Sequence, residues 1–421
     1  MDKRTFIKQL STISLGSTIP FMGVLAKSME EVAHIRPETL AANEDFWAEI
    51  RTGYKLNSAY VNLENGYYCM MPQETLNAYL ENVKEVNFLA SRYMRTVQFD
   101  NRNLARQQLA TMAGCTFDEV VITRNTTESL DLIIGGQDWK KGDEAIYAEQ
   151  DYGSMMDMFR LMGERYGVVS KIVSLPNHPK DDNEIVELYA GQITDKTKLL
   201  MISHVVNITG QVLPVRKICD MAHESGVEVM VDGAHAFAHL DFKIPDLHCD
   251  YYGTSLHKWL SVPLGAGLLY VKKDKILKIW PLFAEAELPR DDIDRLNHMG
   301  TVPVHVELTI PDAVAYYKMI GAKRKEERLK YLKAYWTNKV KNHPNIIINT
   351  PFEPDRSCAI ANVGIREMNS KAMANTLFEK YNIWTVAINR PGVHGCRITP
   401  NVFTSTKELD LFVNALEEMA I

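Results

Sequence analysis

The chain has 421 residues, enough for two or three domains at roughly 150 residues each, and its 46% hydrophobic and 24% charged content is ordinary for a globular protein. A net charge of −6 argues against nucleic acid as the main partner, because phosphate binding needs clustered cations. The six cysteines form no CxxC pair and show no metal-finger spacing, so neither a disulfide scaffold nor a structural metal is predicted.

The first residues have the pattern of an export signal. A basic start, Met1–Lys8, precedes a weakly apolar run up to Leu25, and Val24-Leu25-Ala26 offers small residues for cleavage. The start resembles a twin-arginine signal in which Lys3 replaces the first arginine. We therefore predict a signal over residues 1–26 and a periplasmic or exported protein; an amphipathic N-terminal helix on a cytoplasmic enzyme is the alternative. No later stretch reaches the ~18 apolar residues that a membrane span requires.

Strand and helix patterns then alternate along the chain. Residues 27–60 are predicted to form an N-terminal arm, and the strand pattern after them breaks at Asn65-Gly66, a strong turn signal. Strands are predicted over residues 119–123, 144–148, 171–175, 198–203, 227–231, 250–254 and 265–271, and helices over residues 72–86, 101–114, 155–166, 184–193 and 214–225, with a further helix through Leu130–Ile134. This alternation implies βαβ units and a mostly parallel sheet of the α/β class.

The pattern changes after about residue 310. A long charged helix is predicted from Ala313 to about Val340, followed by short strands over residues 345–348, 359–363, 385–388 and 396–399 and a final helix over residues 406–419. We therefore predict a large domain over residues 61–310 and a smaller α+β domain over residues 311–421.

A candidate phosphate-binding turn follows the strand over residues 119–123. The segment Arg124–Leu130 is a short polar turn that leads into a helix, and the first turn of a helix offers unpaired N–H groups and a positive dipole end to an anion. Thr126 and Thr127 add hydroxyl groups at that place. Simple N-capping by threonine is the alternative interpretation.

An acid and a lysine follow two later strands. Asp232 comes directly after the apolar run Val227–Val231, and Lys258 follows the apolar stretch over residues 250–254. Ligands of open α/β sheets bind outside the carboxyl ends of the strands, so both side chains are expected at one crevice. A pyridoxal phosphate (PLP) enzyme needs this pair, because a lysine forms the Schiff base and an acid keeps the pyridine nitrogen protonated.

With these motifs, the sequence resembles the class V aminotransferases, a family of fold-type I PLP enzymes that contains cysteine desulfurases, kynureninases and isopenicillin-N-epimerase-like proteins. The resemblance runs from about Val61 to Ile421, and the segment Arg124–Leu130 resembles the phosphate turn of the epimerase-like branch. It implies a large PLP-binding domain with a mostly parallel seven-stranded sheet, a smaller C-terminal domain and pyridoxal 5′-phosphate as the cofactor.

The resemblance also implies roles for single residues. Lys258 is expected to form the Schiff base, Asp232 to pair with the pyridine nitrogen, and His235 to lie near the phenolic oxygen of the cofactor. The phosphate is expected to contact Thr126, Thr127, Ser255 and His257. Tyr152 falls where relatives stack an aromatic ring or a histidine on the cofactor, with simple packing as the alternative, and Asn207 falls near the cofactor or substrate. Arg397 is expected to bind the substrate carboxylate, for which a planar guanidinium is well suited.

Two more expectations complete the predicted site. Gly300-Thr301 resembles the segment that reaches the phosphate of a neighbouring subunit, which implies a homodimer with shared active sites. Asn65, in the Asn-Gly turn, is predicted to contact the substrate. His235 and His239 are four residues apart, but without a third ligand or an HExxH context no metal is predicted.

The chemistry that these residues imply begins with removal of a Cα proton by Lys258 from an amino acid or a peptide-like amine. Transamination is the leading interpretation; epimerisation and β-elimination of a C–S bond are the alternatives, and a non-catalytic PLP-fold binding protein is an alternative of another class. Persulfide chemistry is disfavoured, because the segment Val386–Gly395 leaves no room for a cysteine loop. Cys396 alternates with Arg397 on a predicted strand and should point away from the substrate.

Overall fold

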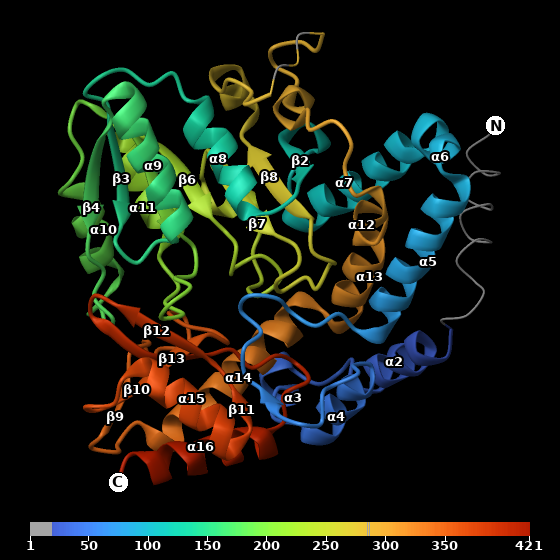
Figure 1. Cartoon of the computed structure of the whole chain (residues 1–421), viewed down its shortest axis with the longest axis vertical. Coiled ribbons are helices and arrows are strands. Elements are labelled where there is room, and N and C mark those ends of the chain that lie inside the picture. The colour runs from blue at the N-terminus through green and yellow to red at the C-terminus, as the bar shows by residue number, and fades with distance from the viewer. Residues whose placement is uncertain (1–18, 284, 286) are drawn as a thin grey trace.

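A seven-stranded sheet forms the centre of the larger part of the molecule (Figure 1). The computed structural model describes residues 19–421 except 284 and 286. The strand order is β2-β8-β7-β6-β5-β3-β4, and the strands of this sheet are β2 (Val120–Thr123), β3 (Glu144–Ala148), β4 (Val169–Val173), β5 (Thr197–Ser203), β6 (Glu228–Asp232), β7 (Tyr251–Ser255) and β8 (Gly267–Val271). Strand β8 runs opposite to the other six strands, so its pairings with β2 and β7 are antiparallel and the remaining pairings are parallel. The predicted mostly parallel seven-stranded sheet is confirmed.

Helices cover both faces of this sheet. The strands are continuous apolar runs, and such strands are stable only when both of their faces are buried. In β6, Met230 packs into one core while Val229 and Val231 pack into the other. One face is covered by α8 (Thr126–Gly136) and α9 (Gly153–Tyr166), and the other by α7 (Gln98–Ala113), α10 (Asp182–Ala190), α11 (Val215–Glu224) and α13 (Ile310–Ile320). The carboxyl ends of the parallel strands therefore stay open at one edge.

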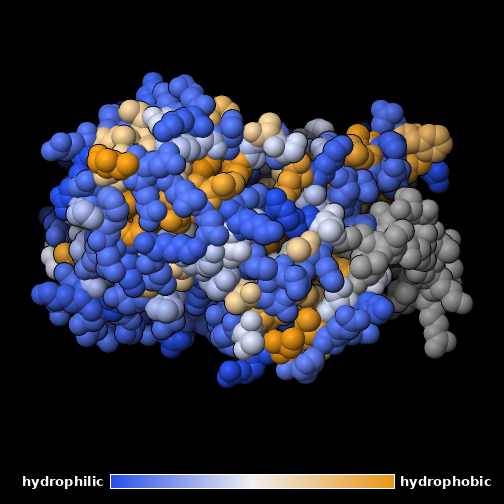
Figure 2. All heavy atoms as spheres, turned by 90° about the horizontal axis from the view of Figure 1, so that it is seen from below, coloured by the Kyte–Doolittle hydropathy of each residue, from blue (hydrophilic) through white to orange (hydrophobic). Residues whose placement is uncertain are grey.

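A smaller C-terminal part packs below the large sheet (Figure 1). Its antiparallel sheet has the order β12-β13-β10-β9, and a third core lies between this sheet and its helices. The elements of this part are α14 (Ala322–Val340), β9 (Ile346–Ile348), β10 (Ala361–Ile365), α15 (Ser370–Tyr381), β11 (Ile383–Trp384), β12 (Val386–Arg390), β13 (Val393–Ile398) and α16 (Thr406–Met419). Seen from below, the surface is largely hydrophilic with scattered hydrophobic groups (Figure 2).

The predicted single long helix over residues 313–340 is wrong. The structure has two helices, α13 and α14, separated at Gly321. Gly321 has a φ of 90°, a left-handed conformation that a helix interior does not allow and that glycine adopts at little cost. Helix α15 was also absent from the sequence prediction.

The N-terminal segment wraps around both parts. Its helices are α2 (Ile19–Glu31), α3 (Pro37–Leu40) and α4 (Glu44–Thr52), and α5 (Gln73–Leu89), α6 (Ser91–Thr96) and α12 (Val304–Leu308) lie beside the large sheet. Strand β1 (Val61–Asn62), at the predicted start of the large domain, pairs in parallel with β11 of the C-terminal part. The domain boundaries themselves stay a prediction.

Most of the predicted export signal lies outside the described residues. The predicted cleavage segment falls within α2, where the side chain of Leu25 is only 2% exposed. None of the helices described from residue 19 onward is long and apolar enough to cross a membrane.

Candidate active site

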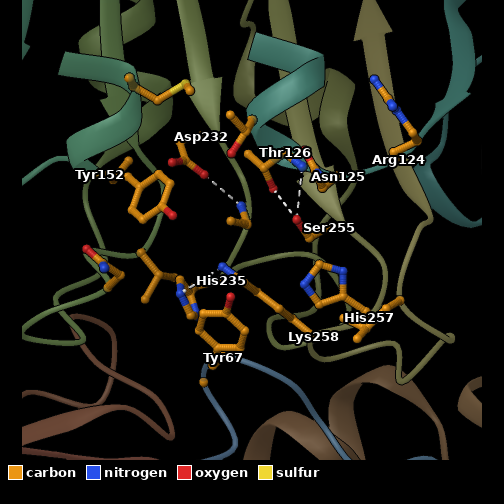
Figure 3. A pocket seen from close by; sticks show the side chains of 18 of the residues that line it. Tyr67, Arg124, Asn125, Thr126, Tyr152, Asp232, His235, Ser255, His257 and Lys258 are labelled. Atoms are coloured by element: carbon orange, nitrogen blue, oxygen red, sulfur yellow. Dashed lines mark hydrogen bonds between the residues drawn. The ribbon is translucent and has the colours of Figure 1, made fainter. Parts of the chain in front are cut away.

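One pocket of about 370 Å³ opens at the carboxyl ends of the parallel strands (Figure 3). Ser203 comes from the end of β5, Asp232 from β6 and Ser255 from β7, while the first turn of α8 closes one side. Arg397 reaches the same pocket from β13 in the C-terminal part. The pocket therefore brings together predicted residues that are up to 271 positions apart in the sequence, counting from Thr126 to Arg397.

Lys258 and His235 lie in contact in the middle of the pocket. The Nζ atom of Lys258 is 3.1 Å from Nε2 of His235. Burial lowers the pKa of Lys258 to about 8, the nearby Asp232 carboxylate opposes this shift, and Arg397 adds to it. Burial also holds the pKa of His235 well below its usual range, and the positive charge of Lys258 lowers it further. The imidazole therefore stays neutral and can accept a hydrogen bond from the lysine.

Asp232 points into the same space from the end of β6 (Figure 3). Its Oδ1 atom accepts a hydrogen bond of 2.9 Å from the backbone N–H of Ala234. Burial raises the pKa of Asp232 and the charge of Lys258 opposes this shift. The carboxylate is 7% exposed, and a buried carboxylate calls for a cationic partner in the pocket.

The turn that is predicted to bind phosphate lies at the N-terminus of α8. The side chain of Asn125 caps this helix by accepting a 2.9 Å hydrogen bond from the N–H of Glu128. Ser255 Oγ accepts a 2.9 Å hydrogen bond from the Thr126 N–H and lies 2.7 Å from Thr126 Oγ1. Thr127 and His257 line the pocket beside them. Hydroxyl groups and helix N–H groups thus converge where an anion is favoured.

The donor set fits PLP. The Nδ1 atoms of His235 and His257 are buried and have no hydrogen-bond partner among the residues that the structure describes, so both are suited to contact a bound ligand. Burial lowers the pKa of His257 to about 4, so its ring is neutral. An acid at one end, an anion-binding turn at the other and a lysine between them match the ring nitrogen, phosphate and carbonyl carbon of this cofactor.

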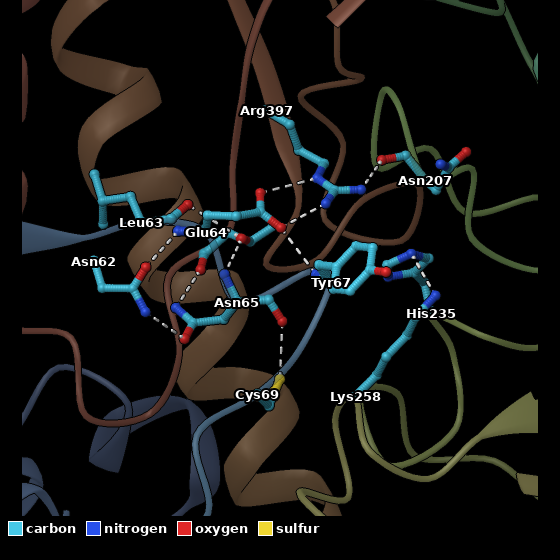
Figure 4. Close-up of polar contacts among 11 residues, drawn as sticks. Asn62, Leu63, Glu64, Asn65, Tyr67, Cys69, Asn207, His235, Lys258 and Arg397 are labelled. Atoms are coloured by element: carbon cyan, nitrogen blue, oxygen red, sulfur yellow. Dashed lines mark hydrogen bonds and ion pairs between the residues drawn. The ribbon is translucent and has the colours of Figure 1, made fainter. Parts of the chain in front are cut away.

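Arg397 lies in the pocket as predicted, but its guanidinium already has partners in the chain (Figure 4). Its Nη2 and Nε atoms lie 2.5 and 3.3 Å from the two carboxylate oxygens of Glu64, and Nη1 donates to the backbone carbonyl of Asn207 at 3.2 Å. Glu64 is not among the residues that the sequence motifs predict. It is adjacent to Asn65, so the predicted Asn-Gly turn was the one signal that pointed near it.

Asn65 itself does not contact the pocket, and its prediction as a substrate-binding residue is wrong. Its side chain is fully buried and donates to the carbonyl of Thr399 at 2.7 Å, and its backbone N–H donates to Thr399 Oγ1 at 2.6 Å. Its neighbours Gly66 and Tyr67 line the pocket instead. The turn was predicted correctly, but the side chain that faces the site was not.

The other predicted residues divide into two groups. Tyr152, at the start of α9, and Asn207 both line the pocket, and the ring of Tyr152 is 46% exposed. Thr301 is exposed and does not line this pocket, so its predicted contact with a neighbouring subunit stays a prediction. Stacking of Tyr152 on the cofactor likewise stays a prediction.

The cysteine and histidine patterns have structural explanations. Cys396 is fully buried in the C-terminal core, on the opposite face of β13 from Arg397, as predicted. Strands β12 and β13 form a tight hairpin through Pro391-Gly392, which confirms that no long cysteine loop is present there. His239 accepts a 2.9 Å hydrogen bond from the N–H of Ala359 and stacks on Trp259. Across residues 19–421, apart from 284 and 286, no three His, Cys, Asp or Glu side chains are grouped as a metal ion would require.

The pocket at the carboxyl ends of the parallel strands contains a lysine in contact with a neutral histidine, a buried acid and a helix N-terminus suited to an anion. This combination is typical of PLP-dependent enzymes. Comparison with known proteins gives the family. The family model for aminotransferase class-V matches residues 68–403, and the chain belongs to this family, whose cofactor is pyridoxal 5′-phosphate.

Individual relatives cover nearly the whole chain. An isopenicillin N epimerase of Amycolatopsis lactamdurans is 27% identical over 399 residues, which span 89% of this chain and 98% of that protein. A probable cysteine desulfurase of Xylella fastidiosa is 24% identical over 88% of this chain and 94% of its own length. Among solved structures, a C-DES variant with glycine covalently linked to its PLP cofactor has a TM-score of 0.79 at 19% identity, covering 87% of this chain and 98% of that one. The last comparison shows the shared fold.

Proposed function

We propose that this enzyme is an aminotransferase-type catalyst that removes a proton from the carbon bearing a substrate's primary amine. The observation that carries the proposal is Lys258, whose Nζ atom contacts the neutral His235 at 3.1 Å and whose pKa is lowered to about 8. PLP, when bound, supplies a carbonyl carbon that bonds covalently to amines and a ring that accepts electrons. All other steps belong to residues of the chain.

Lys258 acts as the general base. A pKa of about 8 places roughly one-tenth of this lysine in the neutral form at pH 7, which suits a group that gains and loses a proton in turnover. His235 accepts a hydrogen bond from Nζ and so orients the lone pair of the amine. Asp232 holds the proton at the ring nitrogen, because a buried carboxylate stabilises a cationic neighbour.

Thr126, Ser255 and the first turn of α8 hold the phosphate and so fix the position of the cofactor in the pocket. Their hydroxyl and N–H groups are positioned by the Asn125 cap and by packing between α8 and β7. Positioning of this kind accounts for a large share of catalysis, because the reacting groups are already held in the orientation that the reaction requires.

Epimerisation is the second candidate reaction. The similarity to isopenicillin N epimerases over 98% of the length of the Amycolatopsis protein supports it. A desulfurase-type reaction that needs a cysteine nucleophile in this pocket is disfavoured, because none of the six cysteines lines it.

A panel of primary amines separates the reactions. The PLP-loaded enzyme is mixed with each amine, the cofactor absorbance is recorded, and the products are identified as a carbonyl compound, an inverted amine or an elimination fragment. Transfer of the amino group to a keto acid supports the proposal. A protein whose cofactor spectrum is the same in wild type and Lys258→Ala, and is unchanged by every amine, would be a binding protein and not an enzyme of this type.

We also propose that the active form is a homodimer and that the protein is exported. Large apolar side chains that remain exposed on α5 and α7, among them Phe88 at 86% and Phe99 at 67%, support an interface on that side. The basic and apolar pattern of residues 1–26 supports export.

A further inference from the structure

The contact between Lys258 and His235 joins two turns of the chain, one after β6 and one after β7 (Figure 3). Each turn contains a residue other than glycine in the left-handed conformation, Ala238 with a φ of 60° and Ser261 with a φ of 58°. This conformation is uncommon for such residues and persists only where the surrounding structure holds it. The position of Lys258 Nζ therefore depends on the contacts that fix these two turns.

The imidazole of His239 fixes the first turn from inside the protein. The side chain is only 1% exposed, and its Nδ1 atom lies 2.6 Å from the backbone carbonyl oxygen of His235. The backbone N–H groups at the end of this turn donate to Ala236, so the His239 ring supplies the donor for the His235 carbonyl. On its other side, Nε2 accepts a 2.9 Å hydrogen bond from the N–H of Ala359, so the one ring proton of a neutral imidazole lies on Nδ1. Burial lowers the pKa of His239 to about 3, and the ring is therefore neutral.

The same ring also fixes the turn that carries Lys258. It stacks on the indole of Trp259, the next residue along the chain, with 3.9 Å between the ring centroids and an angle of 16° between the planes. Trp259 is fully buried, and its Nε1 atom has no hydrogen-bond partner among the residues that the structure describes, so ring packing orients the indole. Its backbone carbonyl accepts a hydrogen bond from the buried Lys325. The residue beside Lys258 is thus held at its ring and at its backbone.

The hydrogen bond from Ala359 connects this ring to the C-terminal part. Ala359 precedes β10, and β10 pairs with β13, the strand that brings Arg397 to the pocket. One imidazole therefore contacts the segments that carry or lead to three pocket residues, His235, Lys258 and Arg397. His239 does not line the pocket itself, so it can affect the reaction only through these segments.

We infer that His239 is a positioning residue, which holds the His235 backbone and the Trp259 ring so that Nζ of Lys258 stays in contact with His235 and correctly placed for covalent capture of PLP. In this capture the neutral amine of Lys258 bonds to the carbonyl carbon of PLP, and one molecule of water leaves. The inference rests on the proposed function, because it presumes that Lys258 is the amine that reacts. A displacement of about 1 Å in a reacting group can cost about 10²-fold in rate, so the effect of such a residue is measurable.

The test measures covalent capture of PLP by the apoenzyme with stopped-flow absorbance from pH 7 to 10. The limiting rate at high pH is compared, so that a change in the pKa of Lys258 does not imitate a change in its position. His239→Phe keeps a flat ring that can stack on Trp259 but loses both hydrogen bonds, and we expect its limiting rate to fall about ten-fold or more. Its affinity for pyridoxamine 5′-phosphate, which fits the same site but has no carbonyl carbon to react, should stay within about two-fold of wild type.

Two amide variants separate the two hydrogen bonds. His239→Asn places its amide nitrogen where Nδ1 lies and can still donate to His235, whereas His239→Gln reaches the position of Nε2 and keeps only the bond from Ala359. We therefore expect His239→Asn to capture PLP faster than His239→Gln. His223→Gln is the control: it changes another histidine, which contacts Asp250 at 2.8 Å at the opposite end of the sheet, and should leave both the capture rate and the affinity unchanged.

A folded His239→Phe protein that captures PLP at the wild-type limiting rate overturns the inference. If that variant fails to fold, the amide pair decides, and an equal rate in both or a faster rate in His239→Gln overturns it. Parallel loss of capture and of pyridoxamine 5′-phosphate affinity in every His239 variant, or failure of all three to fold, would show a merely structural role and overturn it as well. If Lys258→Ala captures PLP as fast as wild type, the proposed function itself fails.

Discussion

Replacing Asp232 with Asn should change two quantities in opposite directions. The neutral fraction of Lys258 should rise, and the rate of proton removal from the substrate should fall. The negative charge of Asp232 raises the pKa of Lys258, which burial otherwise lowers to about 8. Removing the charge should move the lysine pKa further below 8 and so increase the neutral fraction at pH 7. The same change removes the group that keeps the ring nitrogen protonated, so proton removal from the substrate should fall by about 10²-fold or more.

The magnitude follows from the titration. With a pKa of about 8, roughly one-tenth of Lys258 is neutral at pH 7, against roughly one in 3,000 for a lysine near 10.5, a ratio of roughly 300. The rate at which apoenzyme captures PLP covalently should therefore rise with pH to a midpoint near 8. In Asp232→Asn this midpoint should shift downward and capture at pH 7 should become faster, while turnover falls.

Stopped-flow absorbance from pH 6 to 10 measures this capture. A lysine peptide treated in the same way corrects for the titration of PLP itself, and Lys258→Ala gives the background. A midpoint above pH 9.5 in wild type, or a midpoint that rises in Asp232→Asn, would refute the electrostatic reasoning.

Four further outcomes are expected. Ser255→Ala leaves the Thr126 N–H without its partner and should weaken PLP binding about ten-fold, measured as the dissociation constant by fluorescence; an unchanged constant would mean that the turn does not bind phosphate. Asn65→Ala should lower the free energy of unfolding in urea by about 1–3 kcal/mol, since the hydrogen bond from its side chain to the Thr399 carbonyl and the one it accepts from the Asn62 side chain are lost, with PLP affinity retained in the folded protein; a specific loss of PLP affinity would restore Asn65 to the site. Phe88→Asp should reduce the mass in light scattering from dimer to monomer, and an unaltered dimer would place the interface elsewhere. Cys396→Ser should leave the products formed from cysteine unchanged, and abolished sulfur release would contradict its buried, inactive position.

Strand order explains why some of the predicted residues line one pocket, whereas Arg397 was expected there only through the resemblance. Asp232 and Ser255 end neighbouring parallel strands, and the carboxyl ends of such strands meet at one edge whatever the side chains around them. The first turn of α8 was predictable for the same reason, since it directly follows a buried strand.

The residues that the sequence could not give are those fixed by contacts between distant segments. Glu64 and Arg397 form an ion pair although they are 333 positions apart in the sequence. The pairing of β1 with β11 that lies beside this contact is only two residues long, too short for a periodic pattern in the sequence to predict it. The break at Gly321 had a local signal, a glycine within a helical pattern, but glycine is tolerated in helices and only its φ of 90° decides the matter.

The pairing of Glu64 with Arg397 also explains how four charges can share one small pocket. Each cation has an anion: Arg397 contacts Glu64 directly, and the charge of Lys258 is balanced chiefly by Asp232. If Glu64 were absent, Arg397 would still lower the pKa of Lys258, because like charges disfavour one another at short range, while the smaller opposing effect of Glu64 would be lost. The turn at residues 64–67 therefore does more than shape the entrance. By neutralising the arginine it leaves the lysine and the acid as the one pair free to respond to the cofactor and to a substrate amine.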